Sequence, residues 1–344
     1  FDHNRASLKR PRTATLNMGL HYDTINSMNI TSSKSCLSGS ASVPGSKSHT
    51  IRALLLAALA EGTSHIENPL PSADCLSTAQ ALPLIGAELD FGKEGPDFSK
   101  TWTVKGAGKN IHLPTDVVNV GNSGSLLYFL SPIVATFKGY SIFTGDQSIR
   151  KRPVHHVVDA LNQLGAKAAC TIPDSKVCPL IIQGPISNKN KVVTEGSISS
   201  QYISGLMMAA LLMEGTLNIE LTNPKETPYL TMTQKWLEQI GAKVSISEDF
   251  KQISVTGPSE LKAFDTTIPS DWEAVAFPLV AGLISDSDIT IKDIDGSGTQ
   301  GDEKIVEVLQ SLGGSCIWNK EEKTLRVKGS RLSTEKLAGG QLHV

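Results

Sequence analysis

The residues best suited to chemistry lie in ASVPGSKSHTIRALLLAALAEG, residues 41–62, where Lys47, Ser48 and Arg52 occupy the first two turns of a predicted helix. Free N–H groups and the helix dipole make a helix N-terminus attractive to phosphate and carboxylate groups. Ser48 and Arg52 are four residues apart and therefore share one face. A Lys ammonium donates as a point charge, whereas an Arg fork takes a carboxylate through two bonds. The alternative is that Ser46 caps the helix and both cations are solvated.

Three further stretches place polar or basic residues before a predicted helix: VGNSGSLLYF, GSISSQYISGLMMAALL and GDQSIRKRPVHHVVDAL. Their candidate ligands are Asn122, Gly124, Arg152, Ser199, Ser200 and Gln201. A good N-cap explains any one of the small-residue starts alone, and a basic triplet is usually solvated surface. Several such starts at comparable places in a repeat, however, predict that helix N-termini converge on one anion site.

Such a repeat exists. Gly86, Gly165, Gly241 and Gly313 follow apolar helix ends at intervals of 79, 76 and 72 residues, in LPLIGAEL, LNQLGAKA, LEQIGAKV and LQSLGGSC. Each is followed by an alternating run ending in Gly: WTVKG, LIIQG, ISVTG and LRVKG. One unit therefore reads helix, strand, helix, strand, strand, with the marker glycine as a left-handed helix C-cap. The pattern predicts an α/β repeat protein and not a single doubly wound sheet.

Composition restricts the partners. The 344 residues suffice for two domains, and 32 Lys and Arg nearly balance 34 Asp and Glu. This balance excludes a global field that would attract nucleic acid or an acidic membrane, and 5% aromatic residues argue against base stacking. The five cysteines lack CxxC spacing, which indicates reduced thiols in a cytoplasmic protein and not a zinc site or disulfide framework. Phosphate-loop, dinucleotide and nucleophile-elbow motifs are missing from the sequence, so we expect a binder of multiply charged anions without metal or cofactor.

The first 39 residues do not fit the repeat. They lack an initiator Met and a continuous apolar segment, so a secretory signal is excluded. We expect residues 1–39 to be a poorly ordered extension. We interpret the beginning of this segment as the result of a mis-called upstream start, with Met28 as the real one, although the Arg, Ser and Thr content is also compatible with an organelle transit peptide.

The stretches PGSKSHTIRALLLAALAEG, GNSGS, RPVHHVVDALNQLGA, SSQYISGLMMAALL and TPYLTMT together resemble the 5-enolpyruvylshikimate-3-phosphate synthase family, the 3-phosphoshikimate 1-carboxyvinyltransferases. The resemblance extends from about Ala41 to Gly329. It implies two inside-out α/β domains of three units each, with the ligands in the cleft. On that basis we expect residues 44–267 to form a complete three-unit domain. Residues 268–344 would be one unit of a second, incomplete domain, in a chain truncated at its C-terminus.

The resemblance also implies roles for individual residues. The shikimate 3-phosphate side would be formed by Lys47, Ser48, Arg52, Ser199, Ser200, Gln201 and Tyr229. The phosphoenolpyruvate side would be formed by Gly124 and Arg152, with Asn122 shaping the loop and Lys47 reaching across as the catalytic residue. The family's reaction adds the shikimate 5-hydroxyl to C2 of phosphoenolpyruvate while C3 is protonated, and phosphate then leaves. Cations serve such chemistry by positioning the reactants and compensating charge.

Several departures keep alternatives open. Tyr128 and Glu226 stand where the family often has Arg and Ser, and the family's catalytic Asp region does not appear. We therefore expect this chain, a monomer, to bind shikimate 3-phosphate weakly and to turn nothing over. The alternatives are a non-catalytic anion-binding half-enzyme and the related transferase that acts on UDP-N-acetylglucosamine. The basic pair Lys47 and Arg52 disfavours the latter, because it suits a shikimate carboxylate.

Overall fold

The computed structural model describes residues 14–17, 29–32, 35–96, 99–186 and 190–330. The chain divides into two compact units. Unit 1 takes its described residues from Phe1–Ser42, Glu273–Ile294 and Lys304–Val344, and unit 2 consists of Val43–Trp272 and Asp295–Glu303.

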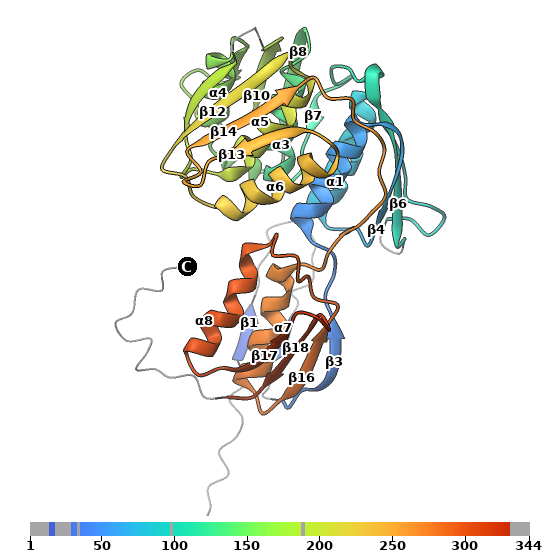
Figure 1. The fold of residues 1–344 in the computed structure, drawn as a ribbon, viewed down its shortest axis with the longest axis vertical. Helices are drawn as coiled ribbons and strands as arrows, with labels where there is room; N and C mark the ends of the chain where they lie inside the picture. The colour runs from blue at the N-terminus through green and yellow to red at the C-terminus, as the bar shows by residue number, and fades with distance from the viewer. Residues whose placement is uncertain (1–13, 18–28, 33–34, 97–98, 187–189, 331–344) are drawn as a thin grey trace, which may run out of the picture. The chain divides into compact units, whose positions relative to one another are not determined.

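Unit 2 contains three copies of the predicted helix-strand-helix-strand-strand unit (Figure 1). The first copy is α1 (Lys47–Leu59), β4 (Glu61–Glu67), α2 (Ala73–Ala81), β5 (Glu88–Asp90) and β6 (Thr101–Ala107). The second is α3 (Gly124–Val134), β8 (Gly139–Thr144), α4 (His155–Gln163), β9 (Lys167–Cys170) and β10 (Leu180–Gly184). The third is α5 (Ser200–Ala209), β12 (Gly215–Thr222), α6 (Thr227–Gln239), β13 (Lys243–Ile246) and β14 (Gln252–Gly257). The predicted α/β repeat is confirmed.

Each copy builds one four-stranded sheet of the same order. The three sheets are β15-β4-β6-β5, β7-β8-β10-β9 and β11-β12-β14-β13. In each, the edge strand β15 (Thr266–Thr267), β7 (Val118–Asn119) or β11 (Lys191–Glu195) runs parallel to its neighbour, and the other pairs are antiparallel. Short 3₁₀ helices are η1 (Pro83–Ile85), η2 (Gly108–Asn110), η3 (Ile149–Lys151), η4 (Ala210–Leu212) and η5 (Gly301–Lys304).

Two sets of glycines explain why the copies keep their spacing. The marker residues Gly86, Gly165, Gly241 and Gly313 have φ values of 99°, 94°, 90° and 90°, the left-handed conformation predicted for helix C-caps. At the second position, a Cβ on Gly106 would lie 2.0 Å from the backbone oxygen of Ala60. The last strand of a copy therefore packs directly on the end of the copy's first helix, which only glycine allows. Similar backbone clashes would arise at Gly184, Gly257 and Gly329.

The inner layer of unit 2 is made of helices. Every residue of α3 is buried, and nearly all of α1 and α5 are buried too. A Cβ on Gly205 in α5 would lie 2.2 Å from the backbone oxygen of Tyr128 in α3, so these two helices touch backbone to backbone. The strands instead alternate between buried and exposed side chains, as β4 and β12 do, because one face of each sheet meets solvent. Figure 1 shows the sheets around these helices, which is the inside-out arrangement predicted.

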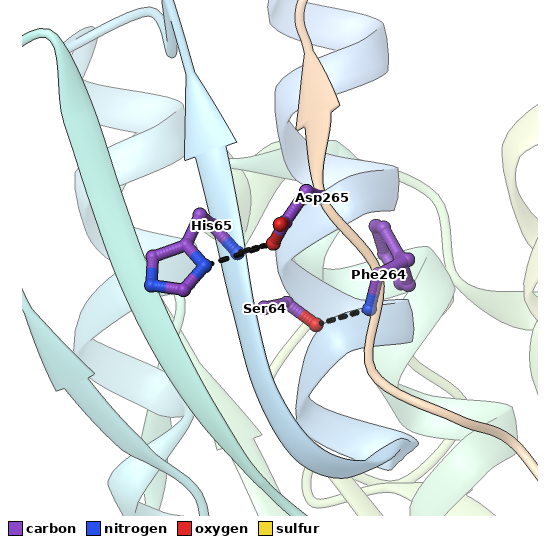
Figure 2. A network of polar contacts seen from close by, with 4 residues as sticks. All are labelled: Ser64, His65, Phe264 and Asp265. Carbon is purple, nitrogen blue, oxygen red and sulfur yellow. Dashed lines mark hydrogen bonds and ion pairs between the residues drawn. The ribbon is translucent and has the colours of Figure 1, made fainter.

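The end of the third copy returns to the first. β15 pairs in parallel with the edge of β4, and Figure 2 shows the side chains that hold the two segments together. Asp265 Oδ1 accepts from the backbone N of His65 at 3.0 Å and contacts His65 Nδ1 at 2.8 Å. Ser64 Oγ accepts from Phe264 N at 3.0 Å. The His65 hydrogen bond is the main reason that the pKa of Asp265 is lowered. The returning strand thus covers the exposed edge of the first sheet.

Unit 1 carries one further copy. It comprises β3 (Ser38–Ser42), α7 (Trp272–Ile284, whose first residue belongs to unit 2), β16 (Asp288–Lys292), α8 (Ile305–Ser311), β17 (Ser315–Asn319) and β18 (Thr324–Lys328). Its sheet has the order β17-β18-β16-β3, with β3 parallel to β16. None of the helices within the described ranges is long and apolar enough to cross a bilayer.

The expected poorly ordered extension, residues 1–39, lies mostly outside the described residues. In the part that is described, β1 (Ala14–Asn17) pairs antiparallel with β2 (Asn29–Ser32). β3 begins at Ser38, inside the segment, because its backbone groups pair with β16. These three strands thus fall wholly or partly within the segment for which we expected poor order. The residues of β3, SGSAS, are all exposed.

Candidate anion site

The N-terminus of α1 is held by a carboxylate from far along the chain. Asp271 Oδ2 accepts from the backbone N of Lys47 at 3.1 Å, and Asp271 N donates to Pro44 O at 2.9 Å. Ser46 N in turn donates to Pro269 O at 2.8 Å. Asp271 thus takes the capping role that the alternative interpretation assigned to Ser46, and that alternative is wrong on this point.

Arg52 is a buried cross-link between helices. Its side chain is 1% exposed, and its guanidinium lies 4.9 Å from the centroid of the Phe129 ring. Nε donates to Thr233 Oγ1 at 2.9 Å, Nη1 to Ser48 O at 2.9 Å, and Nη2 to Tyr229 O at 3.3 Å. A longer contact of 3.5 Å joins Nη2 to Ser204 Oγ. These bonds use four of the five guanidinium N–H donors and tie α1 to α5 and α6.

Burial lowers the pKa of Arg52 to about 9, and the nearby Tyr229 opposes the shift. The guanidinium therefore remains charged at neutral pH inside an apolar environment. Thr233 Oγ1 also bonds Ser204 Oγ at 2.8 Å and Tyr229 O at 2.9 Å, so the network around the cation is continuous. The hydrogen-bond acceptors around the guanidinium are hydroxyl and carbonyl oxygens, which compensate the charge through their dipoles.

The N-terminus of α5 lies beside that of α6. Ser199 Oγ accepts from Gln201 N at 3.1 Å, which caps α5. Ser200 donates from its backbone N at 3.1 Å and from Oγ at 3.0 Å to the same oxygen, Glu226 Oε2. Glu226 O accepts from Tyr229 N at 3.1 Å, at the start of α6. Through Tyr229 O this group continues to Arg52.

A second group of contacts surrounds the N-terminus of α3. Ser123 Oγ accepts from Leu126 N at 3.1 Å, and Asn122 Nδ2 donates to Asp74 Oδ2 of α2 at 3.3 Å. A Cβ built on Gly124 would lie 2.7 Å from Arg152 Nη1, so the exposed guanidinium rests directly on the start of α3.

Two further contacts join this second group to neighbouring segments, one to the loop after Arg152 and one to the start of α1. Tyr128 OH donates to Pro153 O at 2.8 Å and so anchors the segment that follows Arg152. Burial raises the pKa of Tyr128, and the charge of Arg152 opposes the rise. Cys75, next to Asp74 on α2, makes a weak 3.9 Å contact from Sγ to the carbonyl of Lys47. The start of α2 therefore links the starts of α1 and α3.

All ten candidate residues from the sequence lie at or beside helix starts of unit 2, in two contact groups that meet at α1. The first group contains Lys47, Ser48, Arg52, Ser199, Ser200, Gln201 and Tyr229, and the second contains Asn122, Gly124 and Arg152. Sequence reasoning missed Asp271, Asp74 and the serine–threonine pair that holds Arg52. The only signal for Asp271 was the SD pair before an apolar run, and that signal does not say which helix the carboxylate caps.

The fold defines an inside-out α/β repeat protein, and its helix N-termini form a candidate anion site. Comparison with known proteins gives the class a name. A sequence model of EPSP synthase (3-phosphoshikimate 1-carboxyvinyltransferase) matches residues 31–340, nearly the whole chain. The chain therefore belongs to the EPSP synthase family.

Individual relatives agree with this assignment. The chain is 35% identical to the 3-phosphoshikimate 1-carboxyvinyltransferase of Ruminiclostridium cellulolyticum over 299 residues, which cover 87% of this chain and 68% of that protein. It is 37% identical to the protein of the same name from Methanococcus maripaludis over 290 residues, which cover 83% and 65%. Among solved structures, EPSP synthase from Acinetobacter baumannii superposes with a TM-score of 0.70 at 26% identity, covering 86% of this chain and 65% of that one. The chain thus spans about two thirds of the length of these relatives.

Proposed function

We propose that the protein transfers the enolpyruvyl group of phosphoenolpyruvate to the 5-hydroxyl of shikimate 3-phosphate and releases phosphate. The family assignment supplies the reaction class. The observation that supports placing this reaction at the candidate residues is the pair of contact groups at the starts of α1, α3, α5 and α6. Family membership also favours a shikimate substrate over UDP-N-acetylglucosamine.

Shikimate 3-phosphate is assigned to the group that contains Arg52. Lys47, half-buried on the first turn of α1, supplies a mobile ammonium, and Ser48 a hydroxyl on the same helix face as Arg52. Ser199, Ser200 and Gln201 offer hydroxyl, amide and backbone donors at the start of α5, which suit a phosphate. Tyr229 provides a phenol at the start of α6. Arg52, rigidly held by its four partners, fixes the positive potential against which the substrate carboxylate would rest.

Phosphoenolpyruvate is assigned to the group around α3. Gly124 lacks a side chain where Arg152 approaches, so the guanidinium and the backbone N–H groups of the helix can act on one anion. Asn122 is oriented by its bond to Asp74. The cations compensate the charge of both substrates and hold the 5-hydroxyl against C2, and Lys47 is the residue shared by both sides. Stabilisation of this kind requires fixed donors more than a covalent intermediate.

We also propose that the protein is cytoplasmic and monomeric. This proposal is supported by the five free thiols and by the concentration of the candidate residues within one unit of a single chain. Cys75 is an unreactive member of the site, because burial raises its pKa to about 12.

Calorimetric titration of the 344-residue chain with shikimate 3-phosphate tests the substrate assignment. We expect one molecule of shikimate 3-phosphate to bind per chain. Shikimate should bind much more weakly, because it lacks the phosphate that the start of α5 would hold. Failure to bind shikimate 3-phosphate at millimolar concentration contradicts the proposal. Activity is measured as phosphate release from phosphoenolpyruvate that depends on shikimate 3-phosphate, using the whole protein. Binding without release would support the alternative of a non-catalytic anion-binding module.

A further inference from the structure

Glu226 occupies an unusual position between two helices. Its backbone is at the N-cap of α6, whereas its carboxylate bonds the start of α5. Both bonds go to one oxygen, Oε2, from the backbone N and the Oγ of Ser200. The first N–H of a ten-residue helix and the hydroxyl beside it are therefore already bonded to an anion that belongs to the protein.

The loop before α6 holds Glu226 in this place. Its φ and ψ are 52° and 35°, a left-handed conformation that non-glycine residues rarely adopt, and Asn223 also has a positive φ of 46°. Lys225 N donates to Gly196 O at 3.2 Å, which fastens the loop to the segment leading into α5. Backbone strain of this kind persists only where surrounding contacts enforce it, and it is common at ligand sites. The Glu226 side chain itself is exposed and can rotate away without moving the backbone.

We propose that the Glu226 carboxylate is an internal anion that occupies the phosphate position at the start of α5, so that shikimate 3-phosphate binds only by displacing it. The inference rests on the proposed function. Glu226 occupies two of the donors assigned to the substrate phosphate, the backbone N and the Oγ of Ser200, and the Ser200 N–H carries a single hydrogen. A carboxylate and a phosphate at contact distance also repel each other. Glu226 therefore lowers the affinity for phosphorylated ligands specifically and keeps the helix start satisfied in their absence.

Glu226→Gln separates this role from a structural one. The amide retains the shape and an acceptor oxygen for Ser200 but loses the charge that competes with phosphate. We expect the variant to bind shikimate 3-phosphate at least about tenfold more tightly, which corresponds to ~1.4 kcal/mol. The affinity for shikimate, which carries no phosphate, should stay within about twofold of wild type, because a tenfold gain requires the phosphate–carboxylate repulsion.

Glu195→Gln is the matched control. The Glu195 carboxylate accepts from Ser197 N at 3.1 Å and from Thr222 Oγ1 at 2.9 Å, in the segment leading into α5, but bonds neither donor of Ser200. The Glu195→Gln variant loses the same charge in the same part of the molecule. We expect its affinity for shikimate 3-phosphate to rise by less than about threefold, since exposed charges are screened by solvent. Equal gains in the two variants would show a general effect of net charge and would overturn the proposal.

The outcomes distinguish the inference from the proposed function. If wild type binds shikimate 3-phosphate and Glu226→Gln binds it equally or more weakly, Glu226 is not a competitor and the inference fails alone. If neither protein binds shikimate 3-phosphate, the proposed function fails. In that case the Ser200 amide resonance is followed in a titration with inorganic phosphate. A response in Glu226→Gln but not in wild type would still support the internal anion, and no response in either would overturn it. Glu226→Ala, in which the acceptor is removed altogether, replaces Glu226→Gln if thermal unfolding shows that the glutamine variant does not fold.

Discussion

Replacing Gly124 by alanine tests whether the start of α3 and Arg152 act together. The new methyl group would lie 2.7 Å from Arg152 Nη1 and 3.1 Å from Cζ. Ordinary contact begins near 3.4 Å, so the guanidinium must move by about 0.7 Å. Gly124 is the first residue of α3, and its φ lies outside the left-handed region, so the backbone accepts alanine. Since alanine is up to about 1 kcal/mol better than glycine in a helix, we expect the stability to change by less than about 1 kcal/mol.

The catalytic effect should be much larger than the effect on stability. A displacement of about 1 Å in a positioning group can cost about 100-fold, so 0.7 Å predicts a loss of about 10- to 100-fold in kcat/KM for phosphoenolpyruvate. The Michaelis constant for shikimate 3-phosphate should change by less than about threefold, because the proposal assigns that substrate to a different group of residues. Steady-state kinetics of phosphate release by the whole protein, with each substrate varied in turn, measures both values.

A double-mutant cycle with Arg152→Ala decides whether the reasoning is right. If the methyl group acts by displacing the guanidinium, Gly124→Ala should add little to the loss already caused by Arg152→Ala. Fully additive losses in the double variant, or an unchanged kcat/KM for phosphoenolpyruvate in Gly124→Ala, would refute the assignment of phosphoenolpyruvate to Gly124 and Arg152. Gly205→Ala is a contrasting control, because its Cβ would lie 2.2 Å from the backbone oxygen of Tyr128, which cannot swing aside. That variant should lose about 1–3 kcal/mol of stability without selectivity for either substrate.

Three other predictions follow from the described contacts. Arg52→Met should lower the free energy of unfolding, measured in urea, by about 3–5 kcal/mol, because buried hydroxyl and carbonyl acceptors lose their charged donor, at about 1–3 kcal/mol each; a loss below about 1 kcal/mol would mean that Arg52 is not a cross-link. Tyr128→Phe removes the bond to Pro153 O and should raise the phosphoenolpyruvate constant by about two- to tenfold while leaving that for shikimate 3-phosphate unchanged; equal changes in both would contradict a local role. Burial lowers the pKa of His49 from 6.5 to about 4, so the unfolded chain binds the proton first, and stability present above pH 6.5 should fall by about 3 kcal/mol as the pH drops to 4. Urea titrations at several pH values across that range should show that the free energy of unfolding falls less steeply with decreasing pH in His49→Gln than in wild type. An unchanged dependence on pH would show that another group causes the acid sensitivity.

The tautomer of His49 follows from its partners. Trp236 Nε1 is only a donor, and it lies 3.0 Å from His49 Nδ1, so Nδ1 accepts. Nε2 therefore carries the proton and donates to Thr299 Oγ1 at 3.1 Å. Protonation at Nδ1 would break the Trp236 bond, which is the physical reason for the expected loss of stability in acid. Thr299 lies in Asp295–Glu303, the segment that returns to unit 2.

Local features of the fold were predictable from the sequence because local physics determines them. A left-handed turn after a helix favours glycine, and Gly86, Gly165, Gly241 and Gly313 all adopt it. The helix starts were predictable for the same reason, since Ser123 and Ser199 do cap α3 and α5.

The partners of the candidate residues were not predictable, because they come from distant parts of the chain. Asp271 reaches the start of α1 across 224 residues, and Thr233 reaches Arg52 across 181. Segment Asp295–Glu303 belongs to unit 2 although residues of unit 1 separate it from the rest of that unit in the sequence. Gln300 Oε1 in this segment accepts from Trp272 N at 3.0 Å. The substitution at Glu226 was visible in the sequence, but its bonds to Ser200 depend on the tertiary placement of α6 beside α5.

The most direct measurement of the central claim is an amide and guanidinium NMR titration of the 344-residue chain with shikimate 3-phosphate. If helix N-termini form the phosphate and carboxylate sites, the largest shifts should fall on the backbone amides of Lys47, Ser48, Ser200 and Gln201 and on Arg52 Nε. Saturating shifts confined to residues far from these helix starts, or no shifts at millimolar ligand, would contradict the account.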